Sequence, residues 1–356
     1  MGNERITLKQ IAEEAGVSIG TVDRALNNRT GVNEQSKQRV LGVAKKLGYK
    51  PNRFASALSR RSTVRLGVVF PDRPVEFYRE IESGVDQAAG ELFDYGVTIE
   101  KIRFNLNNPA EMRDCLHSLI GGGYDALAIN AAGQAETEDI DDLVNAGVPV
   151  VTFNTDAPGS RRLFYIGSNT RESGRMAGEL LSMLVGGEGV VTVLGNFART
   201  MPFLERFGGF IEYMQSGATR LTVYPCMESQ GDADEITGSL MNLLARTPEL
   251  AGIYCTGYSS TIGAVEALKR LNRADIRLIG YDLTEETAGA LRDGWCDMLL
   301  YQEPFEQGYQ AARLLSRYVL NGWLPDQSQL YLNTQVVVRS NMTSCLHRKA
   351  NFFGRI

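Results

Sequence analysis

The chain has 356 residues, enough for two or three domains, and its 43% hydrophobic and 22% charged residues are typical of a globular protein. No apolar run approaches the roughly 18 residues of a membrane helix, and the first ten residues lack the apolar core of a secretory signal. The composition therefore argues against a membrane partner and against secretion. The five cysteines show no CxxC pairing, so we expect reduced thiols in a cytoplasmic protein.

The net charge of −5 hides an uneven distribution. Residues 1–61 contain 12 Lys and Arg against 5 Asp and Glu, so the remaining chain is strongly acidic. A small basic segment on a larger acidic body suggests that only the segment meets a polyanion. Charge alone leaves open that this is simply a solvated basic face.

Two short helices separated by a glycine are predicted in the basic segment. Thr7 is a suitable cap for a helix over residues 8–15, Gly16 suits a left-handed helix end, and Ser18 can cap a second helix reaching about residue 26. The apolar positions that would pack in this corner are Leu8, Ile11, Ala12, Ala15, Val17 and Val22. This spacing predicts a helix-turn-helix.

The second helix of such a corner enters the major groove with its first residues against base edges. Those positions are Ser18, Ile19 and Gly20, with Arg24 one turn further on. Arg24 can donate two hydrogen bonds to guanine O6 and N7, whereas Ile19 offers only an apolar surface. The alternative for Arg24 is an exposed helix cation paired with Asp23.

Other polar residues of the segment are better placed for phosphates, which fix register without reading sequence. These are Thr21, Asn27 and the start of the first helix at Thr7. A third helix is predicted over residues 34–47, with Val40, Val43, Ala44 and Leu47 facing the first two.

The segment from Ile6 to Arg61 resembles the DNA-binding head of the lac repressor family. The matching motifs are A-x-x-A-G-V-S-x-x-T-V, R-x-L-N and L-G-Y-x-P-N. The resemblance implies that residues 51–62 form a hinge helix that orders on operator DNA and inserts Leu58, with Ala55 nearby, into the minor groove. Asp23 departs from the family pattern, which usually has Ser there. The DNA-contacting set that we predict is Thr7, Ser18, Ile19, Gly20, Thr21, Arg24, Asn27, Asn52, Ala55 and Leu58.

From Thr63 onward, short apolar runs alternate with amphipathic stretches. Nine strands and nine helices are predicted between residues 65 and 320, an alternation that indicates parallel sheets covered on both faces. Two doubly wound lobes with a cleft between them, or a barrel, would both fit the periodicity. The predicted strands are 65–70, 97–102, 126–129, 149–153, 190–194, 221–224, 252–255, 277–280 and 298–301.

Polar residues follow several predicted strands, where ligands of open α/β sheets bind. They are Asn130, the stretch 154–156, the stretch 256–258, Tyr281 with Asp282, and Gln302. Each alone could be a helix cap or turn residue. Five in one alternating array favour a shared polar pocket.

The body resembles the ribose- and galactose-binding class of periplasmic sugar-binding proteins, on the stretches INAAG, VPVVTFNTDAP, ERFGGF, LIGYD and YQEPFEQGYQAA. The resemblance implies an α/β fold of two lobes, each with a doubly wound parallel sheet, around a sugar site. The positions that bind the sugar in that class imply a ligand set in this chain, to which we add Tyr281 as an aromatic that could stack on a sugar. The set is Phe77, Tyr78, Asn130, Asn154, Ser168, Arg206, Gly257, Tyr281, Asp282 and Gln302.

The chemistry of these positions suits a polyhydroxylated ligand. Asp282 can accept from two hydroxyls and Arg206 can donate to two, while aromatic rings can stack on a sugar face. Arg206 could instead be a surface cation, and its place at a helix start also leaves a sugar phosphate open. Asn154 and Gly257 replace charged or amide residues of the ribose binders, so we expect a hexose, polyol or cyclic polyol rather than ribose.

An enzyme on the same body is the rival hypothesis. Both histidines, His117 and His347, lie away from the predicted strand ends, and no GxSxG, Walker A or HExxH motif is present. We therefore expect no catalytic residues, no cofactor and no metal. A secreted solute-binding protein is the third hypothesis, against which the basic head argues.

The resulting prediction is an operator-binding repressor controlled by a small sugar, polyol or sugar phosphate. We expect a head over residues 1–50, a hinge over 51–62, an effector and dimerisation domain over 63–341 and a tail over 342–356. A homodimer would present two heads to a near-palindromic operator. The tail lacks the leucine heptads of tetrameric relatives. Induction is the usual direction in the family, and corepression remains open.

Overall fold

The computed structural model describes residues 7–26, 31–47, 63–73, 75–105, 108–131, 137–195, 201–225, 227–228 and 233–353. The chain divides into two compact units, residues 1–62 and residues 63–356, which we call the head and the body. Each is described by itself.

The head contains the three predicted helices, α1 (Leu8–Ala15), α2 (Ile19–Leu26) and α3 (Glu34–Lys46). Thr7 and Gln10 form a reciprocal capping box at the start of α1, and Gly16 ends that helix at a φ of 63°. The shared core consists of Ile11, Ala12, Ala15, Val22, Ala25, Val40 and Ala44. Small residues at the crossing bring α1 and α2 close together, which confirms the predicted helix-turn-helix.

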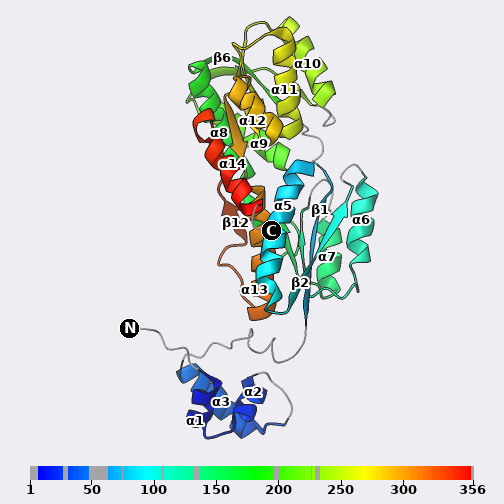
Figure 1. Ribbon diagram of the computed structural model, residues 1–356, viewed down its shortest axis with the longest axis vertical. Coiled ribbons are helices and arrows are strands. Elements are labelled where there is room, and N and C mark those ends of the chain that lie inside the picture. Colours follow the sequence, from blue (N-terminus) through cyan, green and yellow to red (C-terminus); the bar gives the residue numbers. More distant parts are fainter. Residues whose placement is uncertain are drawn as a thin grey trace. The chain divides into compact units, whose positions relative to one another are not determined.

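The body consists of two lobes, each with a twisted sheet between two layers of helices (Figure 1). The first sheet has the strand order β12-β5-β4-β3-β1-β2, and all its strands are parallel. Strands β3 and β4 are buried along their whole length, as expected for a sheet covered on both faces. The strands are β1 (Val64–Pro71), β2 (Val97–Phe104), β3 (Ala126–Ile129), β4 (Val150–Phe153), β5 (Tyr165–Ser168) and β12 (Gln329–Leu332).

The second sheet repeats the order of the first as β13-β11-β10-β9-β6-β7, with β8 (Met227–Glu228) paired to β6. Its edge strand β13 runs antiparallel to β11, the one departure from parallel pairing among the described strand pairs. The two sheets exclude the barrel alternative. The strands are β6 (Glu188–Gly195), β7 (Arg220–Val223), β9 (Leu250–Cys255), β10 (Arg277–Tyr281), β11 (Met298–Tyr301) and β13 (Gln335–Val337).

Helices cover both faces of each sheet. In the first lobe α5 and α13 pack together on one face and α6 and α7 lie on the other (Figure 1). In the second lobe α8 and α9 pack together, and α10, α11 and α12 cover the opposite face. The helices are α5 (Val75–Phe93), α6 (Pro109–Ser118), α7 (Thr137–Asn145), α8 (Thr170–Val185), α9 (Met201–Gln215), α10 (Ala233–Arg246), α11 (Tyr258–Leu271), α12 (Glu285–Asp293), α13 (Pro304–Asn321) and α14 (Arg339–Phe353).

The chain passes between the lobes three times. It leaves the first sheet after β5, returns between β11 and α13, and leaves again between β12 and β13. The sequence predicted neither β5 nor β12 nor β13, and it treated most of α14 as a tail. No described helix combines the length and apolar character that crossing a bilayer requires.

The described cysteines are free thiols packed inside the body. Burial raises the pKa of Cys296 to about 12 and that of Cys255 well above its usual value. Both thiols are therefore neutral packing groups, in line with the interpretation from the sequence.

Candidate functional site

The exposed face of α2 carries the residues predicted to read DNA. Ser18, Ile19, Gly20 and Arg24 are all exposed, and half of the Ile19 surface is open despite its apolar side chain. Ser18 accepts a hydrogen bond from the Thr21 main-chain N–H at 3.1 Å, so it caps the helix as expected. The side chain of Arg24 reaches back over Gly20, where its guanidinium would stand 3.7 Å from a β-carbon, an ordinary van der Waals distance.

Thr7 lies at the start of α1, where its hydroxyl accepts from the main-chain N–H of Gln10. The remaining predicted DNA contacts, Asn27, Asn52, Ala55 and Leu58, lie outside the described residues, as does the hinge over residues 51–62.

In the first lobe, the polar residues at the strand ends are joined by hydrogen bonds. Asn130, directly after β3, donates through Nδ2 to the Tyr78 hydroxyl at 3.2 Å and to Asn154 Oδ1 at 3.1 Å. Asn154 follows β4, and Tyr78 lies on α5. The structure therefore brings these three predicted residues together at one edge of the sheet.

In the second lobe, a buried arginine is the centre of the set. Arg206 donates to the carbonyl of Thr256 at 2.7 Å and to Gln302 Oε1 at 3.1 Å, and Gln302 Nε2 donates to Asp282 Oδ1 at 3.0 Å. The Arg206 guanidinium lies 3.9 Å from the centre of the Tyr281 ring. With only 4% of Arg206 exposed, the alternative of a surface cation is wrong.

Gln307 on α13 connects the two sets, and sequence reasoning missed it. Its Oε1 accepts from Asn154 Nδ2 at 2.9 Å, and its Nε2 donates to the main-chain carbonyl of Gln302 at 2.7 Å. The side chain is fully buried. A signal was present in the sequence, because Gln307 is a polar residue on the apolar stripe of its helix, which includes Gly308, Ala311 and Leu315.

Glu80 on α5 is a second buried polar residue that the sequence did not indicate. Its carboxylate accepts a 2.6 Å hydrogen bond from the hydroxyl of Tyr301, at the end of β11 in the other lobe. Burial and the Glu80 charge together raise the pKa of Tyr301 far above its usual value, so the hydroxyl remains a donor. The bond joins α5 of the first lobe to the end of β11, from which the chain passes back to the first lobe through Gln302.

Two predicted ligand residues, Asn154 and Asp282, occupy equivalent positions and share an uncommon backbone. Their φ angles are 59° and 63°, in the left-handed region that few residues other than glycine adopt. Each main-chain carbonyl accepts from a buried hydroxyl, Tyr165 to Asn154 at 2.9 Å and Thr287 to Asp282 at 2.9 Å. The strained conformation is therefore held by the surrounding structure.

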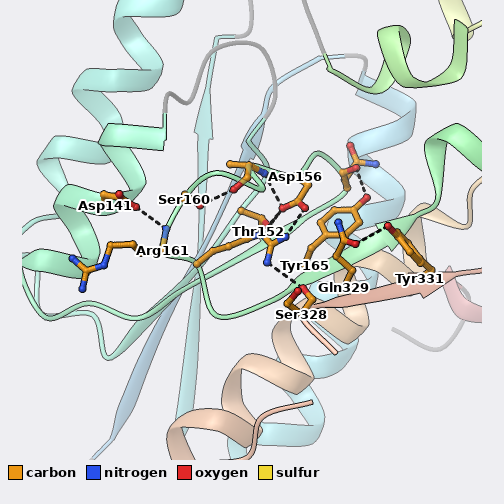
Figure 2. A network of polar contacts seen from close by, with 12 residues as sticks. Asp141, Thr152, Asp156, Ser160, Arg161, Tyr165, Ser328, Gln329 and Tyr331 are labelled. Carbon is orange, nitrogen blue, oxygen red and sulfur yellow. Dashed lines mark hydrogen bonds and ion pairs between the residues drawn. The ribbon is translucent and has the colours of Figure 1, made fainter. Parts of the chain in front are cut away.

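The loop after β4 is further held by an ion pair (Figure 2). Asp156 accepts from Arg162 at 2.6 Å and from the Thr152 hydroxyl at 2.6 Å, and Arg162 also donates to the carbonyl of Ser328. Both charged side chains are mostly buried. This network fixes the turn that presents Asn154.

The remaining predicted ligand residues lie around these sets. Phe77 lines a small pocket between the lobes together with Glu80, Tyr258, Asp282 and Tyr301. Tyr281 is fully buried beneath Arg206, and its hydroxyl donates to Ser173. Gly257 caps α11, where a β-carbon would stand 2.9 Å from the Phe203 ring. Ser168 ends β5 and is buried.

Three predicted ligand residues hold buried polar atoms that have no hydrogen-bond partner within the described residues. These atoms are Asn130 Oδ1, Ser168 Oγ and Arg206 Nε. A buried polar atom without a partner costs free energy, so such atoms mark places that a ligand or water can satisfy. They comprise an acceptor, a hydroxyl and a donor, which together suit hydroxyl groups that both donate and accept.

Within the described part of the chain, no group of three or more His, Cys, Asp or Glu side chains is arranged to hold a metal ion. The arrangement consists of amides, hydroxyls, the Arg206 guanidinium and the carboxylates of Asp282 and Glu80. It can recognise a ligand by directional hydrogen bonds on several sides.

The fold and site define a two-lobed ligand-binding domain linked to a helix-turn-helix head. Residues 66–322 match the family model of periplasmic binding protein domains, and residues 7–52 match that of bacterial regulatory proteins of the lacI family. The chain belongs to the lacI family, and it is therefore a DNA-binding transcriptional regulator. This confirms the resemblance seen in the sequence.

Similar proteins cover nearly the whole chain. It is 25% identical over 344 residues to the ribose operon repressor of Lactococcus lactis subsp. lactis (strain IL1403), covering 94% of this chain and 98% of that protein. It is 23% identical over 341 residues to catabolite control protein A of Priestia megaterium, covering 94% and 99%. A glucose-galactose binding protein from Geobacillus stearothermophilus shares the fold of the body, with a TM-score of 0.72, 24% identity and coverage of 79% of this chain and 99% of that one.

Proposed function

We propose that this regulator is an operator-binding repressor whose affinity for DNA is set by a sugar or polyol bound between the lobes of the body. The observation that carries this is the set of buried amides and charges at the facing strand ends, from Asn130 to Asp282, with its unpartnered atoms. The family membership does not favour the alternatives of a binding protein or enzyme without an operator. As a regulator of transcription it would act in the cytoplasm, as a homodimer on a two-fold operator.

The ligand would act by binding two arrangements of the lobes unequally, because only differential affinity can shift such an equilibrium. Asn154 and Asp282 come from different lobes, so a ligand that contacts both favours one lobe angle. In a dimer, a change of that angle would change the spacing of the two heads. Whether the ligand releases or promotes DNA binding is read from its effect on operator affinity.

The ligand class is tested by a thermal-shift screen of the full chain with sugars, polyols and their phosphates. A ligand at 100 times its dissociation constant stabilises the folded state by about 2.7 kcal/mol. We expect a neutral hexose, polyol or cyclic polyol to raise the unfolding temperature and Asp282→Ala to abolish the shift without loss of operator binding. A normal ligand response in Asp282→Ala would place the site elsewhere.

The DNA role is tested by selecting preferred duplexes from a random pool and measuring Arg24→Ala on the selected operator and its single-base variants. Loss of a guanine contact costs about 1–3 kcal/mol at one base pair and relaxes specificity there. A uniform loss over all sequences would make Arg24 a phosphate contact. Failure to select any duplex, with or without ligand, would contradict the repressor function.

A further inference from the structure

The orientation of the side-chain amides that the first lobe contributes to the predicted ligand site is determined by one main-chain group. An amide has a donor end and an acceptor end, and which end faces a neighbour is fixed by what that neighbour can do. Gln307 faces the main-chain carbonyl of Gln302 at 2.7 Å. Because a carbonyl oxygen can only accept, Gln307 must turn its NH₂ group toward it.

The consequence passes from Gln307 into the first lobe. Its Oε1 faces Asn154, which must donate through Nδ2 at 2.9 Å. Asn154 therefore turns Oδ1 toward Asn130, which donates to it through Nδ2 at 3.1 Å. This leaves Asn130 Oδ1 as the unpartnered atom, buried and able only to accept.

The second lobe does not depend on Gln307 in this way. The amide of Gln302 lies between Arg206, which can only donate, and the Asp282 carboxylate, which accepts. These two charged groups fix its orientation by themselves. Gln307 thus governs the amides of the first lobe alone.

We propose that Gln307 is a specificity-determining positioning residue: by donating to the Gln302 carbonyl it fixes the Asn154 and Asn130 amides so that Asn130 presents an acceptor oxygen to the ligand. The inference rests on the proposed function, since it assigns the ligand a donor group, a hydroxyl or an amine, at this position. Without Gln307 the two asparagines can turn over, and Asn130 can then present N–H instead.

Packing alone does not account for a glutamine at this place. Gln307 is fully buried on the stripe by which α13 packs on α5 and the first sheet, where an apolar side chain of the same length would avoid burying an amide. Its two hydrogen bonds offset that cost only because both partners are in position. The amide is therefore explained by what it orients.

The first test measures coupling between Asn154 and Gln307 in the full chain without ligand. Thermal unfolding midpoints are compared for Asn154→Gly, Gln307→Met and the double variant. Glycine accepts the left-handed backbone at 154, and methionine keeps the length of the side chain at 307. The matched control is Gln310→Met on the same helix, whose amide donates to Glu306 at 2.6 Å instead of to the relay.

We expect the losses at 154 and 307 to be clearly less than additive, because either change breaks the same relay, and those at 154 and 310 to be additive. Additive losses at 154 and 307 would overturn the proposal. This result does not depend on any ligand.

The second test uses Gln307→Glu, in which a protonated carboxyl can replace the amide. Its O–H would donate to the Gln302 carbonyl and its C=O would accept from Asn154. Burial raises the folded-state pKa of such a carboxyl above the ordinary value of about 4.3, so stability is greatest below that value and declines as pH rises through the folded-state pKa. Rescue at low pH relative to Gln307→Met supports the relay, and identical pH profiles of the two variants contradict it.

The ligand arm uses D-ribose, D-galactose and myo-inositol as probes in calorimetric titrations. For a probe that binds the unaltered chain, we expect Gln307→Met to weaken binding about tenfold, the equivalent of one hydrogen bond, and Gln310→Met to leave it unchanged. Equal affinities of the two variants would overturn the specificity role. Binding of none of the probes, with the coupling present, would count against the proposed ligand class while the relay stands.

Discussion

The two lobes of the body share one strand order but present different chemistry at the edge where the ligand residues are predicted. The first lobe contributes a hydroxyl and amides from Tyr78, Asn130 and Asn154, whereas the second contributes the charges of Arg206 and Asp282. In both lobes the residue after the corresponding strand, β4 or β10, has a left-handed backbone, and its carbonyl accepts a hydrogen bond from a buried hydroxyl. The fold thus fixes where a ligand-facing residue stands, and the sequence fixes what it is.

In each lobe, the helix pair that contributes a residue to the predicted site packs closely through glycines. A β-carbon at Gly84 or Gly308 would stand 2.0 or 2.2 Å from a carbonyl oxygen of the opposite helix in the α5–α13 pair. At Gly174 and Gly209 of the α8–α9 pair, the values are 2.0 and 1.9 Å. The close crossings place one long polar side chain per lobe in the site, Gln307 next to Gly308 and Arg206 opposite Gly174.

The largest expected difference between the lobes concerns the loops behind the two left-handed residues. The loop after β4 is held by a buried ion pair, so Arg162→Met leaves Asp156 buried and unpaired and should cost about 3–5 kcal/mol. The corresponding loop after β10 is capped by Thr284, and Thr284→Ala should cost about 1 kcal/mol. Denaturant unfolding measures both, and equal losses would show that the loops are held alike.

Alanine substitutions at the glycines where two helices touch should have similar effects in both lobes. Gly308→Ala and Gly174→Ala each drive a methyl group into a main-chain carbonyl, which only a shift of the helices can relieve, at a cost of about 2–3 kcal/mol. Thermal unfolding gives the cost, and ligand titration shows whether the moved helix also displaces Gln307 or Arg206. A small cost in one lobe alone would break the parallel between the pairs.

Much of the fold could be predicted from the sequence because its periodicity is strong. The strand at 126–129 and the helix at 34–46 agree with the prediction almost to the residue. Strand β5 was missed because its four residues, Tyr165–Ser168, include Gly and Ser and carry no apolar run. Edge strands β12 and β13 are half exposed, so their patterns are weak as well.

The local pattern alone predicted site residues where polar side chains directly follow a strand. The helix residues Tyr78 and Arg206 came only from the family resemblance, and other helix residues were missed. Asn130, Asn154 and Gln302 follow from the rule that ligands bind at the carboxyl ends of strands. Gln307 and Glu80 lie within α13 and α5, and only the packing of those helices shows that they face the site. Gln307 and Glu80 reach the site because the chain passes between the lobes, and no local sequence pattern indicates where it does so.

The hydroxyls behind Asn154 and Asp282 offer a finer comparison. Tyr165→Phe and Thr287→Val each remove the donor to a main-chain carbonyl in a buried place, which should cost about 1–2 kcal/mol. Each hydroxyl has a second partner, the Ser168 carbonyl for Tyr165 and the Thr284 main-chain N–H for Thr287, so the two losses should be similar. Burial holds the pKa of Tyr165 far above its usual value, so its effect should not vary between pH 6 and 9, which unfolding at several pH values checks.

The smallest effect has the opposite sign and tests why the crossing glycines matter. Gly90 on α5 and Gly289 on α12 have no atom within 4 Å of a β-carbon placed on them, and neither has a positive φ. Replacement by alanine should raise stability by about 0.5–1 kcal/mol, because alanine loses less backbone entropy in a helix. If Gly90→Ala instead destabilised the chain as much as Gly84→Ala, the contact with the opposite helix could not be the reason that glycine stands at the crossing. A gain at Gly90 with a loss at Gly84, on the same helix, would tie the requirement to the close approach that brings Gln307 into the site.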